Sequence, residues 1–108
     1  MRDLGDAMEA LSDFESLVRN GLHPGKSLRK VTYRDRWDSL KFAYLQFRIG
    51  QLTVEANAHS SYRSGHLAVR VWDFNKPASD VCRFDMGADA DHVARVVVDY
   101  LNEYEATA

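Results

Sequence analysis

The period of the apolar residues changes twice along this chain of 108 residues, and this change constrains the fold more than any other feature. Near the amino terminus, apolar residues recur at steps of three and four, the spacing of one helical face. Between residues 28 and 86 they alternate at steps of two, as in strands with one covered face. After residue 89 the helical spacing returns. The pattern predicts a single α+β domain in the order α-β-β-β-β-β-α, over residues 1–108.

The first predicted helix has an apolar side and an acidic side. Acidic residues early in the segment suit a helix amino terminus, where the dipole favours negative charge. Asn20 and Gly21 then stop the helix, and we expect the glycine to take the left-handed cap conformation. The expected apolar side consists of Leu4, Ala7, Met8, Leu11, Phe14, Leu17 and Val18, and the outer side of Asp3, Asp6, Glu9, Asp13 and Glu15.

The last segment also predicts a helix, although one alternative remains. Asp89 is the expected N-cap, because its side chain can accept hydrogen bonds from free backbone amides. Three consecutive valines at 96–98 are β-branched, so a sixth strand over 93–101 competes with the helix. The helical spacing continues to Tyr104, which favours the helix. The expected apolar stripe is Val93, Val96, Val97, Tyr100, Leu101 and Tyr104.

Turn signals divide the middle of the chain into five strands. Short connections make neighbouring strands antiparallel, so we predict a five-stranded, mostly antiparallel meander that ends at Gly87. Two terminal helices most economically cover one face of such a sheet and leave the other available. The predicted strands are Leu28–Arg34, Leu40–Ile49, Leu52–Ala58, His66–Phe74 and Val81–Met86.

The alternation within these strands predicts a binding face opposite the helices. Both sides of the second strand are apolar, and the better core set is Ala43, Leu45 and Phe47. Exposed aromatic residues beside arginine are typical of interfaces. The predicted partner-binding residues are Phe42, Tyr44, Arg48, Arg70 and Trp72, with Arg34, Arg36 and Trp37 at the margin. Two other interpretations stay open: plain packing within the sheet, and a homodimer through this face or through an edge strand.

Charge is unevenly distributed along the chain. Residues 26–48 carry seven basic and two acidic side chains, whereas residues 1–25 and 76–108 are acidic. This predicts a two-faced molecule and a binding role. It also allows an alternative, a single-stranded nucleic-acid-binding protein. In this alternative, basic side chains contact phosphates and nearby aromatic rings stack on nucleobases. The basic residues are Lys26, Arg29, Lys30, Arg34, Arg36, Lys41 and Arg48. The net charge of −2 argues against a dedicated nucleic-acid domain.

No motif in the sequence predicts catalysis, a metal or a cofactor. His59 and His66 flank a polar loop and could approach each other, but no ligand stands at the spacing that would complete a site. The run from Asp89 to His92 is explained by a helix cap and favourable first-turn charge. Cys82, the one cysteine, alternates with apolar neighbours and is expected to be a core thiol. We therefore predict a protein without catalytic or metal-ligating residues.

The sequence thus predicts a small, non-enzymatic protein-binding module that inhibits or modulates a larger protein partner. Inhibitors, immunity-type proteins and phage anti-defence proteins are often compact domains of this size with few motifs, and the analogy is one of size and character. No apolar run approaches the roughly 18–20 residues needed to span a membrane. A single cysteine fits a reducing compartment, so the predicted location is the cytoplasm.

Overall fold

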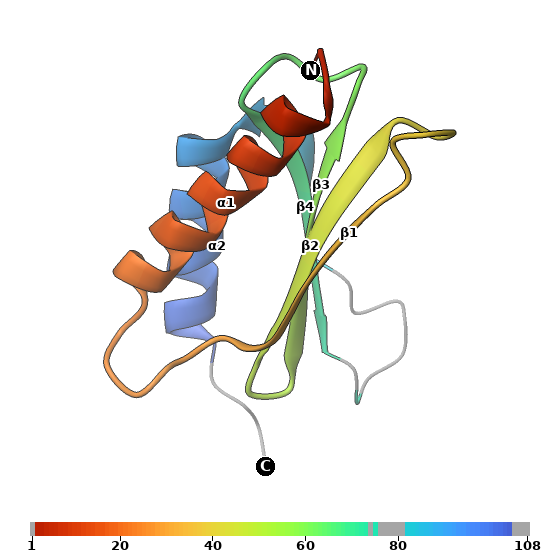
Figure 1. Cartoon of the computed structure of the whole chain (residues 1–108). Coiled ribbons are helices and arrows are strands. Elements are labelled where there is room, and N and C mark those ends of the chain that lie inside the picture. Colours follow the sequence, from red (N-terminus) through yellow and green to blue (C-terminus); the bar gives the residue numbers. More distant parts are fainter. Residues whose placement is uncertain (1, 74, 76–81, 105–108) are drawn as a thin grey trace.

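The chain folds into two layers, a pair of helices packed on one face of an antiparallel sheet (Figure 1). The computed structural model describes residues 2–73, 75 and 82–104. Its elements are α1 (Leu4–Gly21), β1 (Arg29–Asp35), β2 (Phe42–Ile49), β3 (Leu52–His59), β4 (His66–Asp73), β5 (Cys82–Asp89) and α2 (Ala90–Glu103). This order confirms the predicted α+β fold with helices at both ends.

The sheet is a simple meander in which every strand pairs with its neighbour in sequence. The strand order is β1-β2-β3-β4-β5, and all four pairs are antiparallel. Burial on β2 alternates strictly, with Ala43, Leu45, Phe47 and Ile49 buried. The period of two seen in the sequence therefore separates the covered face from the opposite one.

The hydrophobic core lies between the helices and this covered face. The rings of Phe14 from α1 and Phe47 from β2 have their centroids 6.4 Å apart. Both side chains are fully buried, as are Leu11, Val54 and Val71. The predicted core set of the second strand is therefore confirmed. α1 and α2 also pack against each other, so the two helices form one continuous layer (Figure 1).

α1 begins as predicted but ends differently. The Asp3 side chain accepts a hydrogen bond from the amide of Asp6 at 2.8 Å and caps the helix. Gly21 does not take the left-handed conformation. It is the last helical residue, and a Cβ there would lie 2.9 Å from Cγ1 of Val98. Close packing of α1 against α2 thus requires this glycine. Leu17 also differs from the prediction: it was expected on the apolar side of the helix and is 37% exposed.

α2 is a helix, and the alternative of a sixth strand is wrong. The Asp89 side chain accepts from the amide of Asp91, as expected of an N-cap. The buried side consists of Ala90, Val93, Ala94, Val97 and Leu101. Val96 was expected in this stripe but is 36% exposed, because the alanines at 90 and 94 occupy the contact surface instead.

The carboxyl end of α2 holds the segment that follows α1. The Lys26 ammonium donates to the backbone oxygens of Leu101 at 2.5 Å and Asn102 at 3.1 Å, where the helix dipole favours positive charge. The Asn102 side chain donates to the carbonyl of Gly21 and accepts from the amide of His23. These contacts satisfy carbonyl groups at the ends of both helices.

Several strand boundaries differ from the prediction. β1 is shifted by one residue, β3 extends one residue further to His59, and β2 begins at Phe42 because Lys41 has a φ of 56° in the preceding turn. β5 does not end at Met86, and the sheet does not end at Gly87, because the strand continues to Asp89. Gly87 has a φ of 54° and lies within this strand, whose register with β4 shifts between Leu67 and Val69. Phe74, Val81 and the side chain of Cys82 lie outside the described residues.

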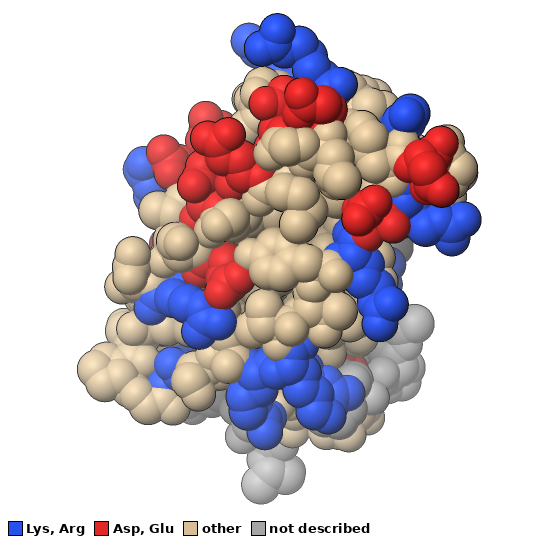
Figure 2. Space-filling view, viewed as in Figure 1, with Lys and Arg blue, Asp and Glu red and all other residues tan. Residues whose placement is uncertain are grey.

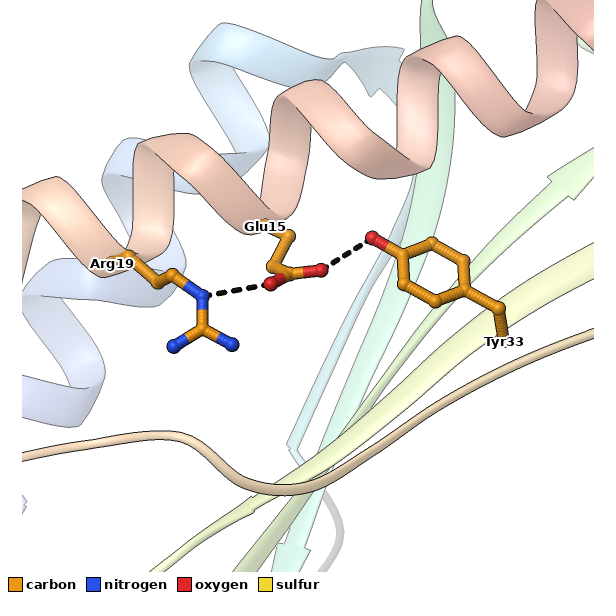
Figure 3. A network of polar contacts seen from close by, with 3 residues as sticks. All are labelled: Glu15, Arg19 and Tyr33. Atoms are coloured by element: carbon orange, nitrogen blue, oxygen red, sulfur yellow. Dashed lines mark hydrogen bonds and ion pairs between the residues drawn. The ribbon is translucent and has the colours of Figure 1, made fainter.

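A small polar network attaches the edge strand β1 to α1 (Figure 3). The Tyr33 hydroxyl donates to Oε1 of Glu15 at 2.5 Å, and Nε of Arg19 donates to Oε2 at 2.7 Å. Burial alone would raise the pKa of Glu15, but the hydrogen bonds from Tyr33 and Arg19 and the Arg19 charge outweigh it and hold this pKa below its ordinary value of 4.5. Burial, followed by the Glu15 hydrogen bond and charge, raises the pKa of Tyr33 well above 10. Glu15 was expected on the solvent side of the helix and is instead half-buried.

Candidate functional site

The sheet face opposite the helices carries most of the predicted binding residues. Register places Arg34, Tyr44, Asn57 and Ala68 in one row across the strands. No helix lies on this side of the sheet in the described part of the chain (Figure 1). We call this surface the open face; it consists of Thr32, Arg34, Phe42, Tyr44, Gln46, Arg48, Thr53, Glu55, Asn57, Ala68, Arg70 and Trp72.

The aromatic side chains of the open face are held by their neighbours. The rings of Phe42 and Tyr44, two residues apart on β2, stack with centroids 6.2 Å apart and an interplanar angle of 18°. On β4, the guanidinium carbon of Arg70 lies 4.7 Å from the centroid of the Trp72 ring. All three rings are half-buried. Their orientations are thus fixed before any partner arrives, which lowers the entropic cost of binding.

The charge of the open face is positive. On β1 to β4, where the side chains are described, its basic residues are Arg34, Arg48 and Arg70 and its acidic residue is Glu55. The Glu55 carboxylate accepts from Nε2 of Gln46 at 3.4 Å and from Nδ2 of Asn57 at 3.3 Å. Arg70 lies opposite Glu55 in the strand register, but within the described residues its guanidinium contacts the Trp72 ring and forms no ion pair with this carboxylate. Arg70 is exposed, so its N–H groups are available to a ligand.

The helical layer has a different charge. Figure 2 shows acidic side chains grouped over the upper part of α1, with basic side chains gathered at the lower end of the view. Outward positions of α1 include Asp3, Glu9 and Asp13, all exposed. The two layers of the molecule therefore offer different electrostatic surfaces to a partner.

A hollow of about 370 Å³ lies at the end of the open face nearest the β3–β4 turn. Its lining residues are Phe42, Asn57, His59, Tyr62, Ala68, Val69 and Arg70. Ala68 contributes only a methyl group between larger neighbours, and this leaves a depression at the turn end of β3 and β4. We call this site the hollow.

The β3–β4 turn positions the aromatic wall of the hollow. The amide of Tyr62 donates to the carbonyl of His59 at 2.9 Å, and the two rings lie 5.8 Å apart. On its other side, the Tyr62 ring is so close to Gly87 that a Cβ there would lie 3.5 Å from Cδ1. Nδ1 of His59 accepts from the amide of Ser61 at 3.0 Å, which leaves the ring proton of a neutral His59 on Nε2.

The structure brings together most, but not all, of the predicted binding residues. Those on the open face are Phe42, Tyr44, Arg48, Arg70, Trp72 and Arg34. Arg36 directly follows β1 and lines another site, of about 490 Å³, with Arg34, Asp35, Phe42 and Tyr44. Trp37 packs against the hydrophobic core instead. Sequence reasoning did not assign His59, Tyr62 and Ala68 to the site, because only the fold of the turn places Tyr62 beside β4.

The two histidines that flank the turn do not form a common site. Nδ1 of His66 lies 2.6 Å from the carbonyl oxygen of Gly87, whereas the His59 ring contacts Ser61 and Tyr62. Within residues 2–73, 75 and 82–104, no three His, Cys, Asp or Glu side chains gather as metal ligands. Neither helix of the described chain is long and apolar enough to cross a bilayer.

Comparisons with protein-family models, with curated proteins and with solved structures find no match for this chain. The open face carries several kinds of groups that can recognise a partner. They comprise aromatic rings, arginine side chains and a hollow, which together suit binding to another surface.

Proposed function

We propose that the protein binds a larger protein through the open face and inhibits or modulates this partner by occupying part of its surface. The observation that carries the proposal is the set of half-buried aromatic rings, Phe42, Tyr44 and Trp72, on the sheet face that neither helix covers. Aromatic residues and arginine are enriched in interface hot spots because they bury a large area at a low entropic cost.

The size of the open face sets how much of a partner it can contact. The four strands β1 to β4 that carry it span three spacings of about 4.8 Å, and strands of eight residues are about 26 Å long, so the face covers roughly 370 Å² in projection. Side-chain relief raises the accessible area above this projection. Specific interfaces bury about 800 Å² on each partner, so a stable complex also requires contacts with the rim of the sheet.

Single substitutions at the rings test the proposal. The tagged protein captures its partner from an extract of the cells that produce it, and binding of the identified partner is then measured by calorimetry. We expect Tyr44→Ala and Trp72→Ala to weaken binding at least 30-fold while leaving the circular dichroism spectrum unchanged. Leu17→Ala is the matched control, because Leu17 is exposed on α1. Normal binding by both folded ring variants would contradict the proposal.

A second candidate partner is single-stranded nucleic acid, supported by the cross-strand pair of Arg34 and Tyr44. A guanidinium beside an aromatic ring can contact a phosphate while the ring stacks on a base. Glu55 in the middle of the open face opposes this reading, because a carboxylate repels the phosphate chain. Nuclease treatment of the extract separates the candidates: capture that survives it supports a protein partner. Capture that disappears, with an affinity that falls steeply with salt, supports nucleic acid.

A further inference from the structure

The shape of the hollow limits what can enter it. Its volume of about 370 Å³ is near the lower end of the roughly 300–1,000 Å³ typical of ligand sites, so it suits one large side chain. Phe42 and Tyr62 provide aromatic walls, and Ala68 leaves the space between them open. A flat apolar group placed there contacts ring faces, a favourable arrangement for aromatic pairs.

The polar groups at the hollow favour an acceptor or an anion. Arg70 is exposed and lines the hollow, and its guanidinium lies over the neighbouring Trp72 ring. A neutral His59 carries its proton on Nε2 and therefore offers one more donor. The side-chain amide of Asn57 donates a hydrogen bond to Glu55. The Glu55 carboxylate is therefore engaged in a hydrogen bond within the open face.

The rest of the open face also favours a negatively charged ligand. Arg34 and Arg48 add positive charge along β1 and β2, against the single carboxylate of Glu55. Charge complementarity steers an acidic surface to this face and disfavours a basic one. The acidic α1 of a second copy would also satisfy the charge, but such a head-to-tail contact is heterologous and builds rings or open chains instead of a simple two-fold dimer.

We infer that the partner binds the open face with an acidic segment in which one aromatic side chain enters the hollow and a neighbouring carboxylate pairs with Arg70. This inference rests on the proposed function, since it assumes that the open face is the binding surface. It goes further by specifying the chemistry of the partner. A nucleic acid strand fits less well, because it would present a row of phosphates to Glu55 as well as to Arg34 and Arg70, whereas a peptide can place a single carboxylate at Arg70.

Selection from a display library of random twelve-residue peptides tests this inference with a defined probe. We expect the peptides enriched on the wild-type protein to share an aromatic residue within a few positions of Asp or Glu. Synthetic peptides of that consensus then bind at least tenfold more weakly to Ala68→Leu, which fills the hollow, and to Arg70→Met, which removes the charge. Ser12→Leu is the matched control, because it adds the same side chain to the exposed side of α1, away from the open face.

Several results would overturn the inference. They are a basic consensus, the absence of enrichment, and peptide binding that the folded Ala68→Leu and Arg70→Met variants retain. Competition by a fifteen-residue thymidine oligonucleotide with a steep salt dependence would replace it with nucleic-acid binding. A concentration-dependent dimer that Ala68→Leu abolishes would replace it with self-association. The proposed function fails separately, when Tyr44→Ala and Trp72→Ala leave partner binding unchanged.

Discussion

Removing the hydroxyl of Tyr33 tests how the edge strand β1 is attached to the helical layer. Tyr33→Phe keeps the ring, which packs against the core, and deletes only the hydrogen bond to Glu15. A hydrogen bond to a charged group contributes about 1.5–3 kcal/mol. The Glu15 side chain retains 20% of its exposure, so water partly replaces the lost donor. We therefore expect a loss of about 1–2 kcal/mol at pH 7, or about 5–8 °C in Tm for a domain of this size.

The pH dependence of this loss identifies its cause. The pKa of Glu15 in the folded protein is below 4.5, so the carboxylate contributes stability that is present above pH 4.5 and is lost as the pH falls through the folded pKa. The difference between wild type and Tyr33→Phe should therefore shrink in acid. The pKa of Tyr33 is raised, so its contribution is complete below pH 10 and decreases as the pH rises further. The variant should lack this alkaline decrease.

Urea unfolding followed by tryptophan fluorescence measures both effects. Tyr44→Phe is the control, because it makes the same chemical change on the open face, where the Tyr44 hydroxyl forms no hydrogen bond with the described residues. The stability of this variant should stay within about 0.5 kcal/mol of wild type. A Tyr33→Phe protein as stable as wild type at pH 7, or a deficit that is unchanged at pH 3, would refute the reasoning.

Three further substitutions test the packing of the two layers, each by urea unfolding. Lys26→Met removes the ammonium from the carboxyl end of α2 and should destabilise the protein by about 1–2 kcal/mol; an equal loss in high salt would contradict the charge–dipole explanation. Gly21→Ala should destabilise the protein by about 1 kcal/mol, because the added Cβ meets Val98, even though alanine has the better helix propensity. Adding Val98→Ala should relieve this loss. Losses of stability that simply add in the double variant would argue against the contact. Asp73→Ala should lose at least about 2 kcal/mol, because the buried carboxylate accepts from Tyr104 and other donors; a loss below 1 kcal/mol would show that water replaces it.

The fold could be predicted because the period of the apolar residues carries most of the information about it. The alternation on β2 determines which side of the strand faces the helices, namely the side that carries Phe47. Short turns then leave few choices of strand pairing. The N-caps at Asp3 and Asp89 are local, since each side chain contacts an amide two or three residues later. Local rules suffice for such features.

Features that depend on distant contacts could not be predicted. Gly21 is a capping residue by local rules, but the approach of Val98 from α2 keeps it helical. Glu15 has the position of a solvent-exposed acid, yet Tyr33, eighteen residues away, draws it into the interface between the layers. Trp37 follows a basic strand and was expected at the binding margin, whereas the turn directs it to the core.

The candidate site shows the same division. Alternation identified Tyr44, Arg70 and Trp72 as residues opposite the core, because this depends only on strand periodicity. The hollow depends on the small side chain of Ala68 and on the return of Tyr62 over Gly87, which require the pairing of β4 with β5. A loop without regular periodicity gives no such information in the sequence.

The most direct test of the open face as the binding surface uses the two tryptophans of the chain. Trp72 lies on the open face, and Trp37 packs against the core, so their indole N–H signals in a ¹⁵N-labelled protein report on the two environments. The labelled protein is mixed with nuclease-treated extract of the cells that produce it. We expect the Trp72 signal to move to a new chemical shift while the Trp37 signal keeps its position. A Trp72 signal that stays in place, while the partner is bound, would contradict the account.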